Sequence, residues 1–479
     1  MTELNFALPG NPRYQPKVLR EVLGYDALYL PIGEVELAAI EVLLEVGFLR
    51  AGLSELLTLE KKRAVLGMPT TRIDEIERSV TKHDIRAWKL KAKEILGPEL
   101  GEFLHILLTS YDPIDTGRAL LFRRIYQVQK PFIMQVISHL RDLVSTHAET
   151  LQIGRTHGQH AIPITVGFWL ATILDRMIFN FEKMDEFAQG LVGKISGAVG
   201  AYNAQVAFNV DDLCEIKTFE ERVLEKVGLT PARISTQRVP PEPLAYYLFS
   251  CTMFSACLGQ FGEDCRHLMR SEIGEIEESF FGQQSGSSTM AHKRNPITFE
   301  QLAGKWKANK IEFLKVLETV VTDHQRDLVS SSIERDFPVI LVNLQVQLDA
   351  LLRKDEEGVP FLSRIRVNEG ACRKHLSENS HLFMAEPLYI ALVLAGYKGD
   401  AHEFVNHKLV PAAKTSQTTV MGVLEDFARE DPELSDVVKA IPFPVKQLLY
   451  RPELYVGKAA EKAREVVEHA YEVQLRLGG

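Results

Sequence analysis

Apolar residues recur every three or four positions along much of this chain, the periodicity of a helix with one buried face. The longest such stretch covers residues 114–144, beyond the length of an ordinary globular helix, and Pro131 within it predicts a kink. Similar stretches cover residues 166–184, 244–269 and about 298–322. Alternation typical of strands is rare. The pattern predicts an all-α protein built around a bundle of long helices.

The lengths of the helical stretches predict three helical domains. Residues 1–111 carry shorter helical segments, and residues 112–365 hold the long ones. Residues 366–479 return to shorter segments, with breaks at 396–399 and 442–444. The faces of the long helices are too apolar for one thin bundle, so we expect several copies of the chain to associate.

Composition and charge exclude several classes of protein. The 64 acidic and 55 basic residues give a formal net charge of −9, which argues against general affinity for nucleic acids. No apolar run reaches the roughly 18 residues of a membrane span, and no secretory signal is recognisable at the start. Five cysteines without a CxxC pair favour a reduced, cytoplasmic protein. The glycines at 197 and 200 lack nucleotide-loop spacing and predict a tight turn.

The most informative segment is the run S-G-S-S-T-M-A-H-K-R-N-P-I-T-F-E at residues 285–300. Its glycine and hydroxyl residues have little intrinsic order, and cations and a carboxylate follow them. Composition alone is also typical of a Gly/Ser linker with a solvated basic end. The order G-S-S-x-M-x-x-K-x-N-P, however, strongly resembles the signature of the fumarase/aspartase superfamily. Members of that superfamily eliminate fumarate from succinyl compounds.

A second run, G-R-T-H-G-Q-H-A, places His157 and His160 three residues apart. Two histidines at this spacing can bind a metal on a helix face, but no cysteine or clear carboxylate follows at ligand spacing, so we predict no metal site. Ordinary core or surface histidines are the alternative. The run resembles the G-R-T-H-G-x-H-A motif of the adenylosuccinate lyase family, whose first histidine is a general acid. That role falls on His157, because the ordinary pKa of histidine lies near neutral pH.

A third run, from His105 to Thr116, resembles the family motif H-x-G-L-T-S-x-D-x-x-D-T. The hydroxyls of Thr109 and Ser110 can bind a carboxylate. An ordinary helix start is the alternative, since Ser, Thr or Asp before Pro commonly caps a helix. Leu107 stands at the usual glycine and Pro113 is unexpected, so the backbone here departs from the family pattern.

The run Q-R-D-L-V-S-S-S-I-E-R, which ends at Arg335, resembles the segment by which these lyases hold the nucleotide. Arg326 and Arg335 can supply forked donors to phosphate, and Ser331 adds a hydroxyl. The alternative is a pair of helix-surface arginines that bind Asp327 and Glu334.

Three shorter segments carry weaker resemblances. Thr81-Lys-His-Asp-Ile-Arg86 is similar to a substrate-contacting T-R-H-D-V segment, although alone it is typical of a solvated helix face. Arg13-Tyr14 matches an R-Y pair that holds the nucleotide phosphate, and Ser235-Thr-Gln237 matches an S-T-Q whose glutamine contacts substrate. The prolines that follow at 240–243 depart from the common R-D pattern.

The resemblance implies a β-elimination without metal or redox cofactor. Ser287 corresponds to the base, and Lys293 and Asn295 to the groups that stabilise charge on the substrate carboxylate. His157 protonates the departing amine, and Glu300 pairs with this histidine. The implied substrate contacts are Arg13, Tyr14, Lys82, His83, Asp84, His105, Thr109, Ser110, Gln237, Ser288, Asn295, Arg326, Ser331 and Arg335.

The implied substrates are small nucleotides, adenylosuccinate and succinyl-aminoimidazole-carboxamide ribotide, each cleaved to fumarate and the remaining nucleotide. The implied assembly is a homotetramer with sites shared among chains. Since a helix of thirty residues spans about 45 Å, motifs at its two ends do not easily meet within one chain. A relative acting on another succinyl or carboxymuconate compound remains an alternative, as does a non-catalytic homologue. The presence of Ser287, Lys293 and His157 argues against the last.

Overall fold

The computed structural model describes residues 8, 10–278, 290, 293–326, 328–378 and 383–478. Helices dominate these residues, and the strands among them form only short two-stranded pairs, which confirms the all-α prediction. Within the same ranges, no helix is both long and apolar enough to cross a membrane.

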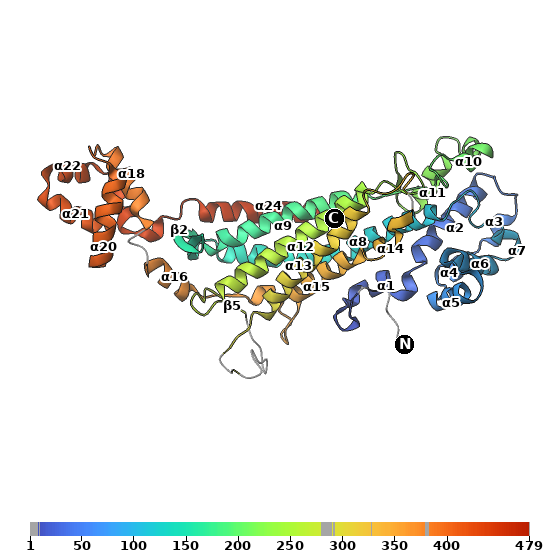
Figure 1. Cartoon of the computed structure of the whole chain (residues 1–479), viewed down its shortest axis with the longest axis horizontal. Helices are drawn as coiled ribbons and strands as arrows, with labels where there is room; N and C mark the ends of the chain where they lie inside the picture. Colours follow the sequence, from blue (N-terminus) through green and yellow to red (C-terminus); the bar gives the residue numbers. More distant parts are fainter. Residues whose placement is uncertain are drawn as a thin grey trace. The chain divides into compact units, whose positions relative to one another are not determined.

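The four predicted long helices are present (Figure 1). They are α8 (Tyr111–Thr146), which runs through Pro131, α9 (Val166–Gln189), α12 (Glu242–Leu268) and α13 (Ile297–Glu318). Helix α13 ends short of the expected residue 322. The segment that follows, Thr-Val-Val-Thr at 319–322, consists of β-branched residues, which disfavour continuation of a helix.

The chain forms two compact units, which we call unit 1 and unit 2. Unit 1 comprises residues 1–135, 179–260 and 301–352, and unit 2 comprises residues 136–178, 261–300 and 353–479. The division therefore falls inside each of the four long helices, so that each helix contributes one section to either unit. The predicted three-domain division, with boundaries after residues 111 and 365, stays a prediction.

Besides its sections of the long helices, unit 1 contains a series of shorter helices and two short strands. Before α8 these are η1 (Pro12–Tyr14), η2 (Lys17–Leu19), α1 (Arg20–Leu23), η3 (Tyr25–Ala27), α2 (Leu30–Glu45), α3 (Leu53–Leu56), α4 (Leu59–Leu66), α5 (Thr70–Ile76), the π-helical η4 (Glu77–Thr81), α6 (Asp84–Leu96) and α7 (Pro98–Gly101). After α9 come β3 (Val192–Gly193), α10 (Asn203–Ala207), η5 (Asp211–Leu213), α11 (Phe219–Lys226) and β4 (Thr230–Pro231), with β3 parallel to β4. After α13 come η6 (Leu328–Ser330), α14 (Ser331–Glu334) and α15 (Pro338–Leu352).

The core of unit 1 lies between α8, α12, α13 and α15. Tyr126 of α8 meets Tyr247 of α12 edge to face, with ring centres 6.3 Å apart. The Gln347 side chain of α15 accepts from Ser255 of α12 at 2.6 Å and donates to the Leu302 carbonyl of α13 at 2.8 Å. These groups are buried and each polar one is hydrogen-bonded, as a bundle interior requires.

Unit 2 combines its sections of the long helices with a hairpin and a group of short helices. Its elements are β1 (Leu151–Thr156), β2 (Gln159–Thr165), β5 (Ile276–Glu277), η7 (Leu362–Arg364), β6 (Arg366–Val367), α16 (Glu369–Glu378), α18 (Ala385–Leu394), α19 (Ala401–Phe404), the π-helical η8 (Val405–Leu409), α20 (Val410–Ser416), α21 (Val420–Glu430), α22 (Pro432–Ala440), α23 (Phe443–Tyr450), η9 (Pro452–Leu454) and α24 (Ala459–Leu477). The predicted break at 396–399 separates α18 from α19. The break predicted at 442–444 lies one residue earlier than expected, at 441–442, and residues 443 and 444 begin α23. The short helices share one hydrophobic cluster, which also takes in Ile153 of β1.

The antiparallel hairpin β1–β2 is an element that the hydrophobic pattern does not predict. Its buried positions include Pro163 and Thr165, whereas Ile162 is 43% exposed. Because the aliphatic residues of β2 do not all face the core, the alternation that normally marks a strand is weak here.

Candidate active site

His157 lies at the tip of the β1–β2 hairpin. Thr156 pairs with Gln159, so His157 and Gly158 are the two central residues of the turn, with φ angles of 53° and 74°. Positive φ at both positions is the geometry of a type I′ turn, in which histidine is unusual but tolerated. The His157 side chain is exposed. The turn therefore presents this imidazole to solvent on a fixed backbone.

A buried carboxylate, Glu275, anchors the hairpin from behind. Glu275 is fully buried and accepts two bonds from Arg155, at 2.5 and 3.0 Å, and one from Gln152 at 2.8 Å. Its Oε1 also lies 2.8 Å from Nδ1 of His375 on α16. Burial acts to raise the pKa of Glu275, but the bonds from Arg155, Gln152 and His375 outweigh it, and the pKa is lowered. The strand that carries His157 is thus tied to an ionised carboxylate.

His160, the second histidine of the motif, faces this cluster. Its ring centre lies 5.7 Å from that of His375. Burial, followed by the nearby Arg155 and His375, lowers the pKa of His160. His160 therefore belongs with the anchor of the hairpin, while His157 points to solvent.

The signature run is described only at its end. Ser287 and Ser288, the predicted base and its neighbour, lie outside the described residues. Lys293 is exposed, Asn295 is half-buried, and Glu300 is exposed in the first turn of α13. Within the described residues no hydrogen bond or ion pair joins Glu300 to His157, so this predicted pairing stays a prediction.

Glu278 connects the chain before the signature run to the last residues of that run. This buried carboxylate precedes the run, and its Oε1 accepts from the backbone N–H of Thr298 and of Phe299, at 3.1 and 3.3 Å, where α13 begins. A carboxylate at the start of a helix accepts hydrogen bonds from N–H groups that have no partner within the helix, and its negative charge interacts favourably with the helix dipole. Burial nevertheless raises the pKa of Glu278 to about 7, with a smaller contribution from Glu300. Glu278 therefore changes charge near neutral pH.

In unit 1, Asp112 organises the predicted carboxylate-binding segment. Its Oδ2 accepts from the Thr109 N–H at 2.7 Å, which fixes the backbone beside Ser110. Its Oδ1 accepts from Nζ of Lys194 and, at 3.1 Å, from the N–H of Ser196. Asp112 and Lys194 are both fully buried. Thr109 and Ser110 are thus held against the segment at 194–197 by a buried ion pair.

The predicted tight turn at 197–200 is confirmed, with the Gly200 N–H donating to the Gly197 carbonyl at 3.4 Å. A Cβ on Gly200, which has a φ of 74°, would lie 2.3 Å from the Ser235 carbonyl oxygen. This close approach lets the Ser196 and Ser235 hydroxyls meet at 2.6 Å. The turn therefore brings the S-T-Q segment to the Asp112–Lys194 pair.

The departures from the family pattern at 105–113 have clear structural forms. Leu107 has a φ of 63°, the left-handed conformation that suits the glycine usually found there, so a leucine at this position is strained. Pro113 falls in the first turn of α8, where the missing N–H costs nothing. His105 has a φ of 68°, and its Nδ1 lies 2.6 Å from Oε1 of the buried Glu36.

Lys82 and His83 are exposed in the break between η4 and α6, and Asp84 is the first residue of α6. Lys82 has a φ of 54° and His83 is the extended N-cap of α6. Nδ1 of His83 lies 3.2 Å from Oδ1 of Asp84. Burial and then Asp84 raise the pKa of the buried Tyr29, whereas Arg335 lowers it. Tyr29 therefore lies near both Asp84 and Arg335, so the predicted substrate-binding segments at 81–86 and 325–335 approach each other at this tyrosine.

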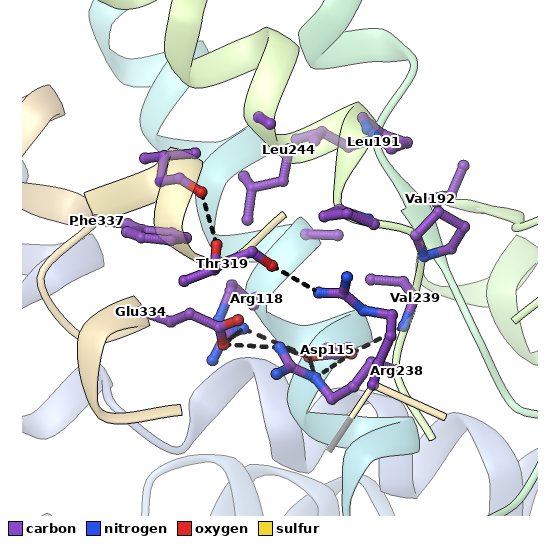
Figure 2. A pocket seen from close by; sticks show the side chains of 17 residues that line it. Asp115, Arg118, Leu191, Val192, Arg238, Val239, Leu244, Thr319, Glu334 and Phe337 are labelled. Carbon is purple, nitrogen blue, oxygen red and sulfur yellow. Dashed lines mark hydrogen bonds and ion pairs between the residues drawn. The ribbon is translucent and has the colours of Figure 1, made fainter. Parts of the chain in front are cut away.

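The two arginines of the predicted nucleotide-binding segment line different pockets. Arg326, with a φ of 57°, donates to the Thr319 carbonyl at 3.3 Å, and with Arg238 it lines a pocket of about 40 Å³. Figure 2 shows Arg238 and Thr319 in this pocket. Arg335 is exposed and lines a largely apolar cavity of about 210 Å³. Among the described residues Glu334 pairs with Arg118 and Arg238, at 2.5 and 2.7 Å, and not with Arg326 or Arg335. Asp327, the other partner in the alternative interpretation, lies outside the described residues.

The remaining predicted substrate contacts lie in three separate segments of unit 1. Ser331 begins α14 and is half-buried. Gln237 is half-buried in the loop before α12. Arg13 and Tyr14 form the exposed η1, with the guanidinium 5.7 Å from the centre of the tyrosine ring.

The predicted site residues are thus divided between the two units. His157, Lys293, Asn295 and Glu300 belong to unit 2, whereas every other described substrate contact belongs to unit 1. Sequence reasoning missed the groups that hold them in place, which are Glu275, Glu278, Lys194 and Arg238. Their partners lie far away in the sequence, so local spacing carries no signal for them.

Comparison with known proteins places this arrangement among lyases. The family model described as "Lyase" matches residues 69–308. Adenylosuccinate lyase of Pyrococcus horikoshii is 34% identical over 409 residues, which are 85% of this chain and 85% of that protein. Adenylosuccinate lyase of Methanocaldococcus jannaschii is 31% identical over 463 residues, or 96% of this chain and 95% of that protein.

Solved structures share the fold. A fumarate lyase from Mesorhizobium superposes with a TM-score of 0.79 at 20% identity, covering 96% of this chain and 100% of that one. A 3-carboxy-cis,cis-muconate lactonizing enzyme from Pseudomonas putida gives 0.78 at 20% identity, with 96% and 98% covered. At this level of identity the likeness concerns the fold alone.

Proposed function

Because this chain belongs to the adenylosuccinate lyase family of the fumarase/aspartase superfamily, we propose that it eliminates fumarate from adenylosuccinate and leaves AMP. The same site would cleave succinyl-aminoimidazole-carboxamide ribotide to fumarate and the carboxamide ribotide. The observation that carries this proposal is the similarity to relatives with that name over most of the chain. The reaction needs no metal or redox cofactor.

The first chemical step is removal of a proton from the substrate carbon beside a carboxylate. We assign it to Ser287, whose hydroxyl is inert at its ordinary pKa and needs a nearby cation and exclusion of water to ionise. The electron pair left on carbon delocalises into the neighbouring carboxylate. Lys293 and Asn295, which follow the serines in the same run, supply a cation and an amide donor for that charge.

In the second step the electron pair on carbon forms the C=C bond of fumarate, the C–N bond breaks with its electrons leaving on nitrogen, and the amine of the nucleotide takes up a proton. His157 suits the role of donor, because the I′ turn presents an exposed imidazole on a backbone tied to Glu275. Glu300, on the first turn of α13, would hold the imidazole in one tautomer and support its charge.

The nucleotide end has its support in unit 1. Arg326 and Arg335 are cations suited to a phosphate, and Ser331 adds a hydroxyl. Within the described residues Glu334 forms its ion pairs with Arg118 and Arg238 and not with Arg326 or Arg335. These groups favour a phosphate-bearing substrate over another succinyl or carboxymuconate compound, the alternative within the superfamily.

We further propose a cytoplasmic homotetramer whose sites combine residues from different chains. Ile311, Leu314 and Leu317 recur every three residues on α13 and are 59%, 57% and 52% exposed in the single chain. An apolar row of this kind needs a partner to cover it. All five cysteines are buried free thiols, which suits a reducing compartment.

Subunit exchange tests the shared site. Inactive His157→Ala and Ser287→Ala proteins are mixed, exchanged and assayed. Partial recovery of activity is expected, because some sites then carry both intact groups. If exchange is proven and activity does not return, the two residues come from one chain.

A direct assay tests the function. The purified protein is incubated with adenylosuccinate, and fumarate and AMP are quantified against the His157→Ala protein as control. Equal amounts of both products, formed by the unaltered protein alone, are expected. An unaltered protein that leaves adenylosuccinate intact but converts a carboxymuconate would favour the alternative.

A further inference from the structure

Gln237, a predicted substrate contact, lies at the apex of a small turn. The Thr236 N–H donates to the Arg238 carbonyl at 3.0 Å, and the Arg238 N–H donates to the Thr236 hydroxyl at 3.3 Å. On its N-terminal side, the turn is attached through the Ser235 hydroxyl to Ser196 at 2.6 Å. The direction of the Gln237 side chain therefore depends on what holds the other side of the turn.

The Arg238 side chain holds that other side. It is 3% exposed and points inward, where Figure 2 shows it between Asp115 and Glu334. Nε donates to Oδ2 of Asp115 at 2.9 Å, and Nη2 donates to Oδ1 of the same carboxylate at 2.9 Å. The Val239 N–H adds a bond to Asp115 at 3.0 Å. This forked contact with a buried carboxylate on α8 is one that only a guanidinium can make.

The same guanidinium reaches the nucleotide segment. Nη2 of Arg238 donates to Oε2 of Glu334 at 2.7 Å, and Oε1 of Glu334 accepts from the Ser330 hydroxyl at 3.2 Å. Glu334 is the last residue of α14, which begins at Ser331 and is followed directly by Arg335. One buried side chain is thus bonded to both segments that the family resemblance assigns to the substrate.

We propose that Arg238 is a positioning residue that sets Gln237 and the Ser331–Arg335 segment in register for one nucleotide. The inference rests on the proposed function, because it takes both segments as substrate contacts. Because Arg238 is almost fully buried and its guanidinium is bonded to Asp115 and Glu334, we assign it no direct contact with substrate. Arg238 acts through the hydrogen bonds that its guanidinium makes to Asp115 and to Glu334. A positive charge without the guanidinium geometry cannot make the same set of bonds.

Arg238→Lys separates charge from geometry, since lysine keeps the cation but loses the fork. We expect the KM for adenylosuccinate and the Kd for AMP each to rise about tenfold, with kcat changed less than about threefold. Arg118→Lys is the matched control, because Arg118 binds the same two carboxylates, Glu334 at 2.5 Å and Asp115 at 3.4 Å, but has no bond to the 235–239 segment within the described residues. Its KM is expected to change less than about threefold. Unaltered KM and AMP affinity in Arg238→Lys, or an equal loss in Arg118→Lys, overturns the proposal.

A double-mutant cycle tests whether Arg238 acts through Gln237. Gln237→Ala is expected to weaken AMP binding clearly in the wild-type background and little in Arg238→Lys, because the glutamine is already misplaced there. Equal losses in both backgrounds contradict the proposal. If Arg238→Lys does not fold, the cycle is run with Asp115→Asn, which keeps the shape of the carboxylate and weakens the fork that holds the turn, and the same outcomes decide.

Failure of this inference is distinguishable from failure of the proposed function. A wild-type protein inactive on adenylosuccinate removes the proposed function itself. A wild-type protein that is active, beside an Arg238→Lys protein with the same KM and AMP affinity, removes only the role of Arg238.

Discussion

Unit 1 and unit 2 hold their proposed site residues by different means. In unit 1, the segments assigned to substrate binding are held by buried ion pairs, Asp112 with Lys194 and Arg238 with Asp115 and Glu334. In unit 2, the proposed acid His157 is exposed at a turn, and the nearby buried carboxylates, Glu275 and Glu278, stand behind the reacting groups.

The difference follows from what each set of residues must do. Binding a nucleotide sums several modest contacts, each of which depends on geometry, and buried forked ion pairs fix geometry well. Proton transfer needs groups that change charge near neutral pH, which complete burial in a low-dielectric interior disfavours. The bonds from Arg155, Gln152 and His375 lower the pKa of Glu275 despite its burial. Burial raises the pKa of Glu278, because the backbone N–H groups of Thr298 and Phe299 offset it only in part.

The largest expected effect is on chemistry in the signature run. Ser287→Ala removes the proposed base, so kcat should fall by about 10²–10⁴-fold while AMP binds as before. Steady-state kinetics and AMP titration measure the two quantities, with Ser285→Ala in the same run as control. A Ser287→Ala protein that keeps more than about half of its kcat places the base elsewhere.

In unit 1 the largest effect should be on stability. Lys194→Met leaves Asp112 buried without its cation, and the free energy of unfolding should fall by about 3–5 kcal/mol. Chemical denaturation measures it, with Lys183→Met as control. Lys183 is an exposed lysine paired with Glu186, and its loss should cost less than about 1 kcal/mol. Equal costs for the two lysines would mean that the buried pair is not what holds this segment.

Helix content and the main motifs were predictable from the sequence, but the supports were not. Period and length place α8, α9, α12 and α13, because an apolar helical face repeats locally. Departure from a motif also marked Leu107, which the structure shows at positive φ. Lys194 meets Asp112 across 82 residues and Arg238 meets Asp115 across 123, so nothing nearby in the sequence signals either pair.

The hairpin anchor of unit 2 should affect kcat more than binding. Glu275→Gln removes the charge that holds Arg155, so the His157 turn loses its fixed position and kcat should fall by about 10–100-fold. AMP affinity should stay unchanged, since the nucleotide contacts lie in unit 1. Glu277→Gln, two residues along the chain, is the control. A Glu275→Gln protein with weaker AMP binding and normal kcat contradicts the assigned role.

The smallest expected effect is the pH dependence from Glu278. Its pKa is raised to about 7 from an ordinary 4.5, so the folded protein keeps this proton after the unfolded chain has lost it. Between these two pKa values the free energy of unfolding falls as the pH rises. Above about pH 7 the loss of unfolding free energy is complete and no longer changes with pH. Glu278→Gln should therefore gain about 1–3 kcal/mol relative to wild type between pH 4.5 and 7. Denaturation across that range measures it, and a difference that does not vary with pH refutes the titration of Glu278.

The division between a binding unit and a chemical unit is tested most directly by calorimetric titration of AMP and fumarate into two variants. Arg335→Ala, in unit 1, is expected to weaken AMP about tenfold or more and fumarate little, because it removes a phosphate contact. His157→Ala, in unit 2, is expected to bind AMP as wild type does although its turnover is lost. Weakened AMP binding in His157→Ala together with wild-type AMP affinity in Arg335→Ala would contradict the division.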